Sequence, residues 1–230
     1  MALIFDNDLA ICGLGMSCQT ALQLDEHRAY LEELVGRPAT RCSTPFDWLV
    51  CGPSSIARMI AENRFFPQSP KGFTKSPYPR WDDLQVLYLH EKNVVTNFGT
   101  ASSKWQHITE NFALISKARR KVFILSNTQN NLLKMGEGRL EKGWSDLTDL
   151  SVMAVRQALV KRFGPVELYC VVYADRHSLT ENADLEGLHT LKRDASEVVG
   201  DQQAWRRVLW NILREHAKVF GQLAMPQVPS

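Results

Sequence analysis

The sequence predicts an α/β protein, specifically a three-layer α/β/α sandwich whose central sheet is mostly parallel. Short apolar runs at residues 9–13, 122–125 and 166–173 have the length of buried strands. Amphipathic segments with a helical period lie between and after these runs, and such alternation is typical of a parallel sheet covered by helices. A chain of 230 residues suffices for one large core, so residues 1–230 are expected to form a single domain.

The first predicted unit is a strand, a glycine turn and a helix. The strand over residues 9–13 runs into the turn Gly-Leu-Gly, and residues 18–35 place leucine and valine on one face of a helix. Ser17 has a side chain preferred at an N-cap, and Gly36 is expected to end the helix.

The middle of the chain predicts a helix, a long loop and a hairpin. The helix begins at Pro53 and ends near Asn63. Residues 67–80 are rich in Pro, Ser, Gly and Lys, and this loop has the length of a lid or a substrate loop. A strand over residues 86–90 follows, with residues 93–98 as its expected hairpin partner.

The second half of the chain continues the alternation. Helices are expected at residues 102–120, 147–163 and 203–220, with the apolar strands between them. The polar stretch over residues 174–200 predicts irregular structure, and the tail at residues 225–230 is expected to fray.

Composition and charge exclude several classes of protein. Hydrophobic residues make up 44% and charged residues 23%, as in ordinary globular domains, and a formal net charge of +2 gives no reason to expect a nucleic-acid partner. No apolar run is long enough to span a membrane, and the first residues lack the basic leader of a signal peptide. Five cysteines without a Cys-x-x-Cys pair argue against a disulfide framework and a metal site, and indicate a cytoplasmic protein.

Cys18 is the residue that carries chemistry in this pattern. A thiol at a helix start lies beside unpaired N–H groups, which lower its pKa and favour the nucleophilic thiolate. The N–H groups of Cys18 and Gln19, after the turn at Gly15 and Ser17, can also bind an oxyanion. Two other interpretations stay open. Cys18 can simply pack the helix on the sheet, or residues 13–19 can bind an anion in a nucleotide- or small-molecule-binding module.

The motifs GLGMSCQTALQL and STPFDWL, followed by a strand ending in His90, resemble an uncharacterised bacterial family of papain-like cysteine peptidases. Members of that family resemble this chain in three features, which are a G-x-x-C-Q motif, a later P-F-D-W motif and a His-Asp pair at the end of a strand. The resemblance covers about residues 9–130. One departure is that Glu91, and not aspartate, follows His90.

The resemblance implies that Cys18 is the nucleophile and His90 the general base. For the group that orients the imidazole, the sequence offers Asn127 after the strand at 122–125, with Gln129 and Glu91 as weaker choices.

Two further residues are candidates for the site. His177, two residues after Asp175, is the second choice of base, because the pair approximates the Asp-x-x-His of serine esterases. Asp47 lies within an aromatic segment, where a carboxylate needs a partner; it either caps a turn or supports the site.

The predicted function is therefore that of a cysteine-dependent hydrolase or acyltransferase. It acts without a cofactor on a peptide, amide, ester or acyl-thioester carbonyl, and the substrate is either free or bound to a carrier. The alternatives are the non-catalytic binding module and a family member that lost activity and serves as an interaction domain.

Overall fold

A computed structural model describes residues 1–74, 78–91, 93–194, 196 and 198–219 of the chain. The tail predicted to fray, residues 225–230, lies outside this part. None of the helices in the described ranges combines the length and the apolar character needed to cross a bilayer.

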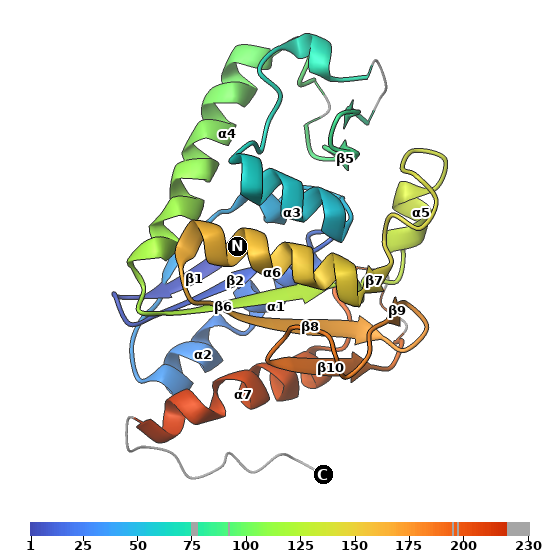
Figure 1. Ribbon diagram of the computed structural model, residues 1–230. Helices are drawn as coiled ribbons and strands as arrows, with labels where there is room; N and C mark the ends of the chain where they lie inside the picture. The colour runs from blue at the N-terminus through green and yellow to red at the C-terminus, as the bar shows by residue number, and fades with distance from the viewer. Residues whose placement is uncertain (75–77, 92, 195, 197, 220–230) are drawn as a thin grey trace.

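A six-stranded sheet lies at the centre, with its strands in the order β10-β8-β6-β2-β1-β3 (Figure 1). Strands β10, β8, β6 and β2 are parallel to their neighbours in that series, whereas β1 is antiparallel to both β2 and β3. The prediction of an α/β protein with a mostly parallel sheet is confirmed. In chain order the strands are β1 (Ala2–Phe5), β2 (Leu9–Gly13), β3 (Thr40–Cys42), β6 (Arg120–Ser126), β8 (Glu167–Tyr173) and β10 (Gly187–Leu191).

Helices supply the crossovers that parallel strands require. Figure 1 shows α3 and α6 on one side of the sheet and α2 and α7 on the other. The helices are α1 (Gln19–Glu26), α2 (Arg28–Val35), α3 (Pro53–Glu62), α4 (Phe98–Ala113), α5 (Leu132–Gly136), α6 (Asp149–Phe163) and α7 (Gln202–Val219), with 3₁₀ turns η1 (Pro45–Asp47), η2 (Pro70–Gly72) and η3 (Leu114–Lys117).

Buried apolar side chains form two clusters, and alternate residues of β2 belong to each. Ala10 and Cys12 join the cluster that includes residues of α3, α4 and α6, whereas Leu9 and Ile11 join the cluster that includes residues of α1, α2 and α7. Because successive side chains of a strand point to opposite faces, β2 is buried on both sides. Burial on both faces explains its continuous apolar run.

The helix predicted over residues 18–35 is two helices, since α1 ends at Glu26 and α2 begins at Arg28. His27 is the cap between them, with φ −93° and ψ 10°, outside the helical values. The N-cap of α1 is Cys18, so the assignment of Ser17 as the cap is wrong. Ser17 is buried in the turn ahead of the helix.

The glycines before α1 allow the helix to approach the sheet closely. A Cβ on Gly13 would lie 2.9 Å from Thr20 Cγ2, and one on Gly15 would lie 2.3 Å from the Ser17 carbonyl oxygen. Real Cβ atoms do not approach other atoms so closely, so this strand-to-helix turn needs both glycines.

The strand predicted over residues 86–90 is shorter and lies outside the main sheet. β5 (Val86–Leu87) pairs antiparallel with β4 (Arg80–Trp81), so the expected pairing with residues 93–98 is wrong. The chain turns after Tyr88, whose carbonyl accepts from the Glu91 N–H over 3.1 Å. His90 is therefore a turn residue.

Three strands of the main sheet, β1, β3 and β10, have no counterpart in the predicted elements. β1 forms from the first residues of the chain, and β10 lies in the segment over 174–200 that was expected to be irregular. β10 is an edge strand whose side chains are only half-buried or exposed, so it lacks the apolar run of a central strand. Strand β9 (His177–Ser178) in the same segment pairs with β7 (Leu147–Thr148).

Candidate functional site

The carboxyl ends of β2 and β6 bring the Cys18 turn and the 126–130 segment together. The Leu14 N–H donates to Ile124 O over 2.8 Å, and the Met16 N–H donates to Ser126 O over 3.2 Å. These bonds continue the parallel pairing beyond β2 and carry the chain toward α1. Residues on the two loops can thus meet at one edge of the sheet, where open α/β sheets bind ligands.

Cys18 is the one cysteine of the five that is not classed as buried. Its Sγ lies 3.9 Å from Gln129 Oε1 and donates a weak hydrogen bond to it. Burial raises the pKa of the Cys18 thiol, and a hydrogen bond from the residue's own N–H opposes this effect. The expectation of a lowered thiol pKa is wrong for this conformation, because the cost of desolvating the thiolate is larger.

The Gln19 side chain is fixed by its own hydrogen bonds. Its Nε2 donates to the carbonyls of Thr128, at 3.4 Å, and Val199, at 3.2 Å, while its Oε1 accepts from Thr128 Oγ1 at 2.6 Å. The amide therefore ties α1 to the loop after β6 and to the segment before α7. The backbone N–H groups of the first turn, which a helix leaves unpaired, are the other donors beside Cys18.

Asn127 is buried and joins the loops after β6 and β8. Its Nδ2 donates to the Arg176 carbonyl over 2.6 Å, whereas its Oδ1 is buried without a hydrogen-bond partner in the described structure. Within that same part of the chain, no histidine ring is bonded to Asn127. No contact in the described structure therefore supports the prediction that Asn127 orients an imidazole.

Arg176 shapes the loop that carries Gln129. Its guanidinium donates to three carbonyl oxygens, those of Asn127 at 2.8 Å, Gln129 at 2.6 Å and Asn130 at 3.0 Å. Only 8% of Arg176 is exposed, and burial lowers its pKa. Sequence reasoning overlooked this residue, although an arginine beside the candidate His177 was a signal for it.

His90 lies in a different environment from Cys18. Its ring packs edge-on against Trp48, with centroids 5.4 Å apart, and it makes no hydrogen bond to another described residue. Burial lowers the pKa of His90, and the Lys104 charge lowers it further. Glu91 accepts hydrogen bonds from Lys104 Nζ and, over 3.3 Å, from Trp105 Nε1.

A pocket of about 450 Å³ lies beside His90. Across the described residues, no hydrogen bond or ring contact links His90 to Cys18. The pocket is lined by Leu89, His90, Glu91, Asn93, Val94, Asn97, Thr100, Ala101 and Lys104.

The two segments are nevertheless connected through the backbone. The Cys51 N–H donates to Met16 O over 3.3 Å, and the adjacent residue Val50 forms a bridge with Leu87 of β5. Cys18 lies two residues after Met16, and His90 lies three residues after Leu87.

Two other candidates have local structural partners. Asp47 is buried, accepts from the Thr44 N–H at 2.9 Å and from Thr44 Oγ1 at 2.8 Å, and forms an ion pair with the Met1 ammonium. It therefore caps η1. His177 lies on β9, and its Nδ1 accepts from the Leu179 N–H over 3.2 Å.

Comparison of the chain with protein-family models, with curated proteins and with solved structures finds no match. The described side chains include no group of three or more His, Cys, Asp and Glu placed to hold a metal ion. The site is thus defined by the polar side chains and the thiol at the carboxyl edge of the sheet.

Proposed function

We propose that the protein is a cysteine-dependent hydrolase or acyltransferase with Cys18 as its nucleophile. The observation that carries this proposal is the place of Cys18. Cys18 is partly exposed, whereas the other four cysteines are buried, and it is the N-cap residue of α1 at the carboxyl edge of the parallel sheet. A nucleophilic thiol and backbone N–H groups for the oxyanion are two of the three parts that an acyl-transfer site needs, and a general base is the third.

The reaction would form a thioester and then consume it. Cys18 Sγ attacks the carbonyl carbon of an amide, ester or thioester, and its proton passes to a base. The N–H groups of Cys18 and Gln19 stabilise the oxyanion, and the protonated base then donates to the leaving group. Water or an acceptor amine then attacks the acyl-enzyme and restores the thiol, so the proposed reaction needs no cofactor.

The base in this proposal is His90, with His177 as the second choice. The lowered pKa of His90 keeps its imidazole neutral at pH 7, the form that accepts a proton. In the described conformation the Cys18 thiol donates to Gln129, and an amide oxygen cannot take the proton away. Catalysis therefore requires the imidazole to replace Gln129 at the sulfur when substrate binds.

A small thioester, S-acetyl-N-acetylcysteamine, tests the proposal. Mass spectrometry should detect an acetyl group on Cys18 in the wild type and none in Cys18→Ser. The acetylation rate should fall as pH drops below 6.5, because protonated His90 cannot act as a base. His90→Gln should slow acetylation at pH 7 and move the pH profile up to that of the thiol alone, because the reaction then depends on the thiolate fraction. His177→Gln is the matched control that should keep the wild-type profile.

An unmodified Cys18, or a rate that both histidine variants leave unchanged, would overturn the proposal. A shifted pH profile in His177→Gln alone would assign the base to His177. Protection of Cys18 from iodoacetamide by a nucleotide, without acylation, would support the anion-binding module formed by residues 13–19 instead.

We also infer a three-layer α/β/α arrangement and a cytoplasmic location. The two apolar clusters, to which β2 contributes from opposite faces, support the layers. The absence of any disulfide among the five cysteines, all of which are described, supports a reducing compartment. Peptides, amides and acyl thioesters are the proposed substrates.

A further inference from the structure

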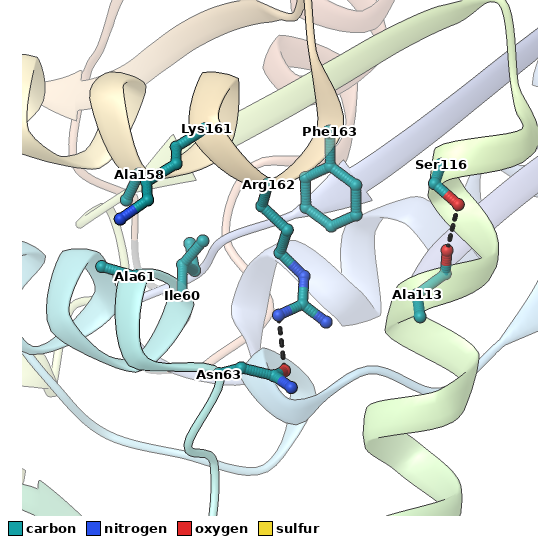
Figure 2. A pocket seen from close by; sticks show the side chains of 9 residues that line it. All are labelled: Ile60, Ala61, Asn63, Ala113, Ser116, Ala158, Lys161, Arg162 and Phe163. Atoms are coloured by element: carbon teal, nitrogen blue, oxygen red, sulfur yellow. Dashed lines mark hydrogen bonds between the residues drawn. The ribbon is translucent and has the colours of Figure 1, made fainter.

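A second pocket lies where α3, α4 and α6 end, and its volume is about 400 Å³ (Figure 2). α6 leads through Gly164 into β8, so this pocket lies at the amino ends of the strands, opposite the Cys18 edge. It is lined by Ile60, Ala61, Asn63, Ala113, Ser116, Ala158, Lys161, Arg162 and Phe163.

Arg162 provides a positive charge that lacks an acidic partner. Its Nη1 donates to Asn63 Oδ1, which is its one hydrogen bond to the described part of the chain, and no described carboxylate forms an ion pair with it. By contrast, Arg156 on the same helix binds both carboxylate oxygens of Glu186, at 2.9 and 2.8 Å. Since a guanidinium has five N–H donors, most of those on Arg162 remain available.

Aromatic rings hold the guanidinium of Arg162 in place. Its central carbon lies 5.6 Å from the ring centroid of Phe65 and 5.3 Å from those of Phe112 and Phe163. These rings stabilise a cation through their faces but offer no hydrogen-bond acceptor. Burial lowers the pKa of Arg162, which an incoming anion would offset.

No other residue of the described lining offsets the positive charge of Arg162. Lys161 adds a second cation, and the described lining contains neither aspartate nor glutamate. The C-terminal dipole of α6 favours cations in its last turn, which explains why both are tolerated there, but it does not occupy the free N–H donors. Asn63 and Ser116 are the uncharged polar residues of the lining, and the rest of the wall is apolar, formed by Ile60, the three alanines and the Phe163 ring.

We propose that this pocket binds a small amphipathic organic acid, whose carboxylate pairs with Arg162 and whose short apolar chain lies on the alanine-lined wall. Arginine recognises carboxylates through two parallel N–H donors, and Lys161 adds charge at the rim. The apolar wall selects acids with a hydrocarbon chain over simple inorganic anions. This binding site is independent of the function proposed for Cys18.

Titration of the full chain with hexanoate, followed by NMR amide shifts, tests the proposal. Saturable shifts are expected at residues around the pocket, with much weaker binding of hexan-1-ol, hexylamine and acetate. Arg162→Gln should weaken hexanoate binding at least about tenfold, or about 1.4 kcal/mol. Arg162→Lys, which keeps the charge, should recover part of the affinity.

Two control variants separate binding from folding and from catalysis. Ala113→Leu fills the pocket from an exposed helical position and should abolish binding while the protein stays folded. Arg156→Gln removes a cation outside the pocket, Cys18→Ser removes the proposed nucleophile, and both should bind hexanoate like the wild type. Equal binding of hexan-1-ol, or wild-type affinity in both Arg162→Gln and Ala113→Leu, would overturn the proposal.

Discussion

The carboxyl edge around Cys18 and the pocket around His90 hold their polar groups in different ways. Gln19, Asn127 and Arg176 are buried and hydrogen-bonded to backbone carbonyls of neighbouring segments. His90 is exposed, with an edge-on ring contact to Trp48. Hydrogen bonds to the backbone fix direction as well as distance, whereas ring and charge contacts tolerate movement. The Cys18 thiol therefore lies in a frame of hydrogen-bonded side chains, whereas the His90 imidazole has one ring contact and no hydrogen bond to a described residue.

This difference has a consequence for the proposed reaction. A thiol that donates to Gln129 is held in its neutral form, and the proposed reaction needs the imidazole to reach the sulfur while the hydrogen bonds of the frame stay in place. Binding of substrate would then favour the conformation in which the two meet, by its differential affinity for that state. The frame, the thiol contact and the imidazole can each be altered separately.

The largest effect is expected from breaking the frame with Arg176→Ala. Three buried carbonyl oxygens would lose a charged donor, which should lower the free energy of unfolding by about 3 kcal/mol. Urea denaturation measures this change. Arg193→Ala is the matched control, because Arg193 also lies over the Tyr173 ring but is 43% exposed and pairs with Asp175. Its loss should change stability by less than about 0.5 kcal/mol. Equal effects of the two variants would show that Arg176 does not hold the frame.

A smaller effect is expected at the thiol contact. Gln129→Glu would place a carboxylate beside Cys18 Sγ, and a like charge at this distance raises the thiol pKa by about one unit or more. Iodoacetamide should then label Cys18 about tenfold more slowly at pH 8, because the thiolate fraction falls by that factor. Gln129→Met removes the amide without adding charge and should label within about threefold of the wild type. Identical rates in the Glu and Met variants would place the side chain of residue 129 away from the sulfur in solution.

The sequence predicts the meeting of the two loops at the sheet edge, but not the Arg176 hydrogen bonds that hold them. The apolar runs before Gly13 and Ser126 identify two strands, and the edge rule for parallel sheets brings Cys18 toward Asn127 and Gln129. In the structure Cys18 contacts Gln129, which ranked below Asn127 as a candidate for orienting the imidazole. The residue types alone cannot tell whether Asn127 or Gln129 lies nearer Cys18. That depends on the path of the loop, which the hydrogen bonds of Arg176 hold.

The environment of His90 could not be predicted in the same way. The run over residues 86–90 has the apolar character of a central strand, yet β5 packs in a separate two-stranded sheet and stops at Leu87. Its apolar residues are explained by contacts with an aromatic cluster that includes Tyr88 and Trp105, and not by a place in the main sheet. An apolar composition predicts that a strand is buried, but it does not predict the sheet to which the strand belongs.

The smallest effect is expected at the imidazole itself. The Lys104 charge lowers the pKa of His90, whereas Glu91 raises it, and burial is the largest cause of the net decrease. Lys104→Gln should therefore raise the His90 pKa, because it removes one of the two causes that lower it. Glu91→Gln should shift it in the opposite direction. NMR titration of the imidazole measures both changes, with His107, an exposed ring on the same α4 helix, as the internal reference. Shifts of one sign in both variants would mean that the ring responds to a conformational change and not to the two charges.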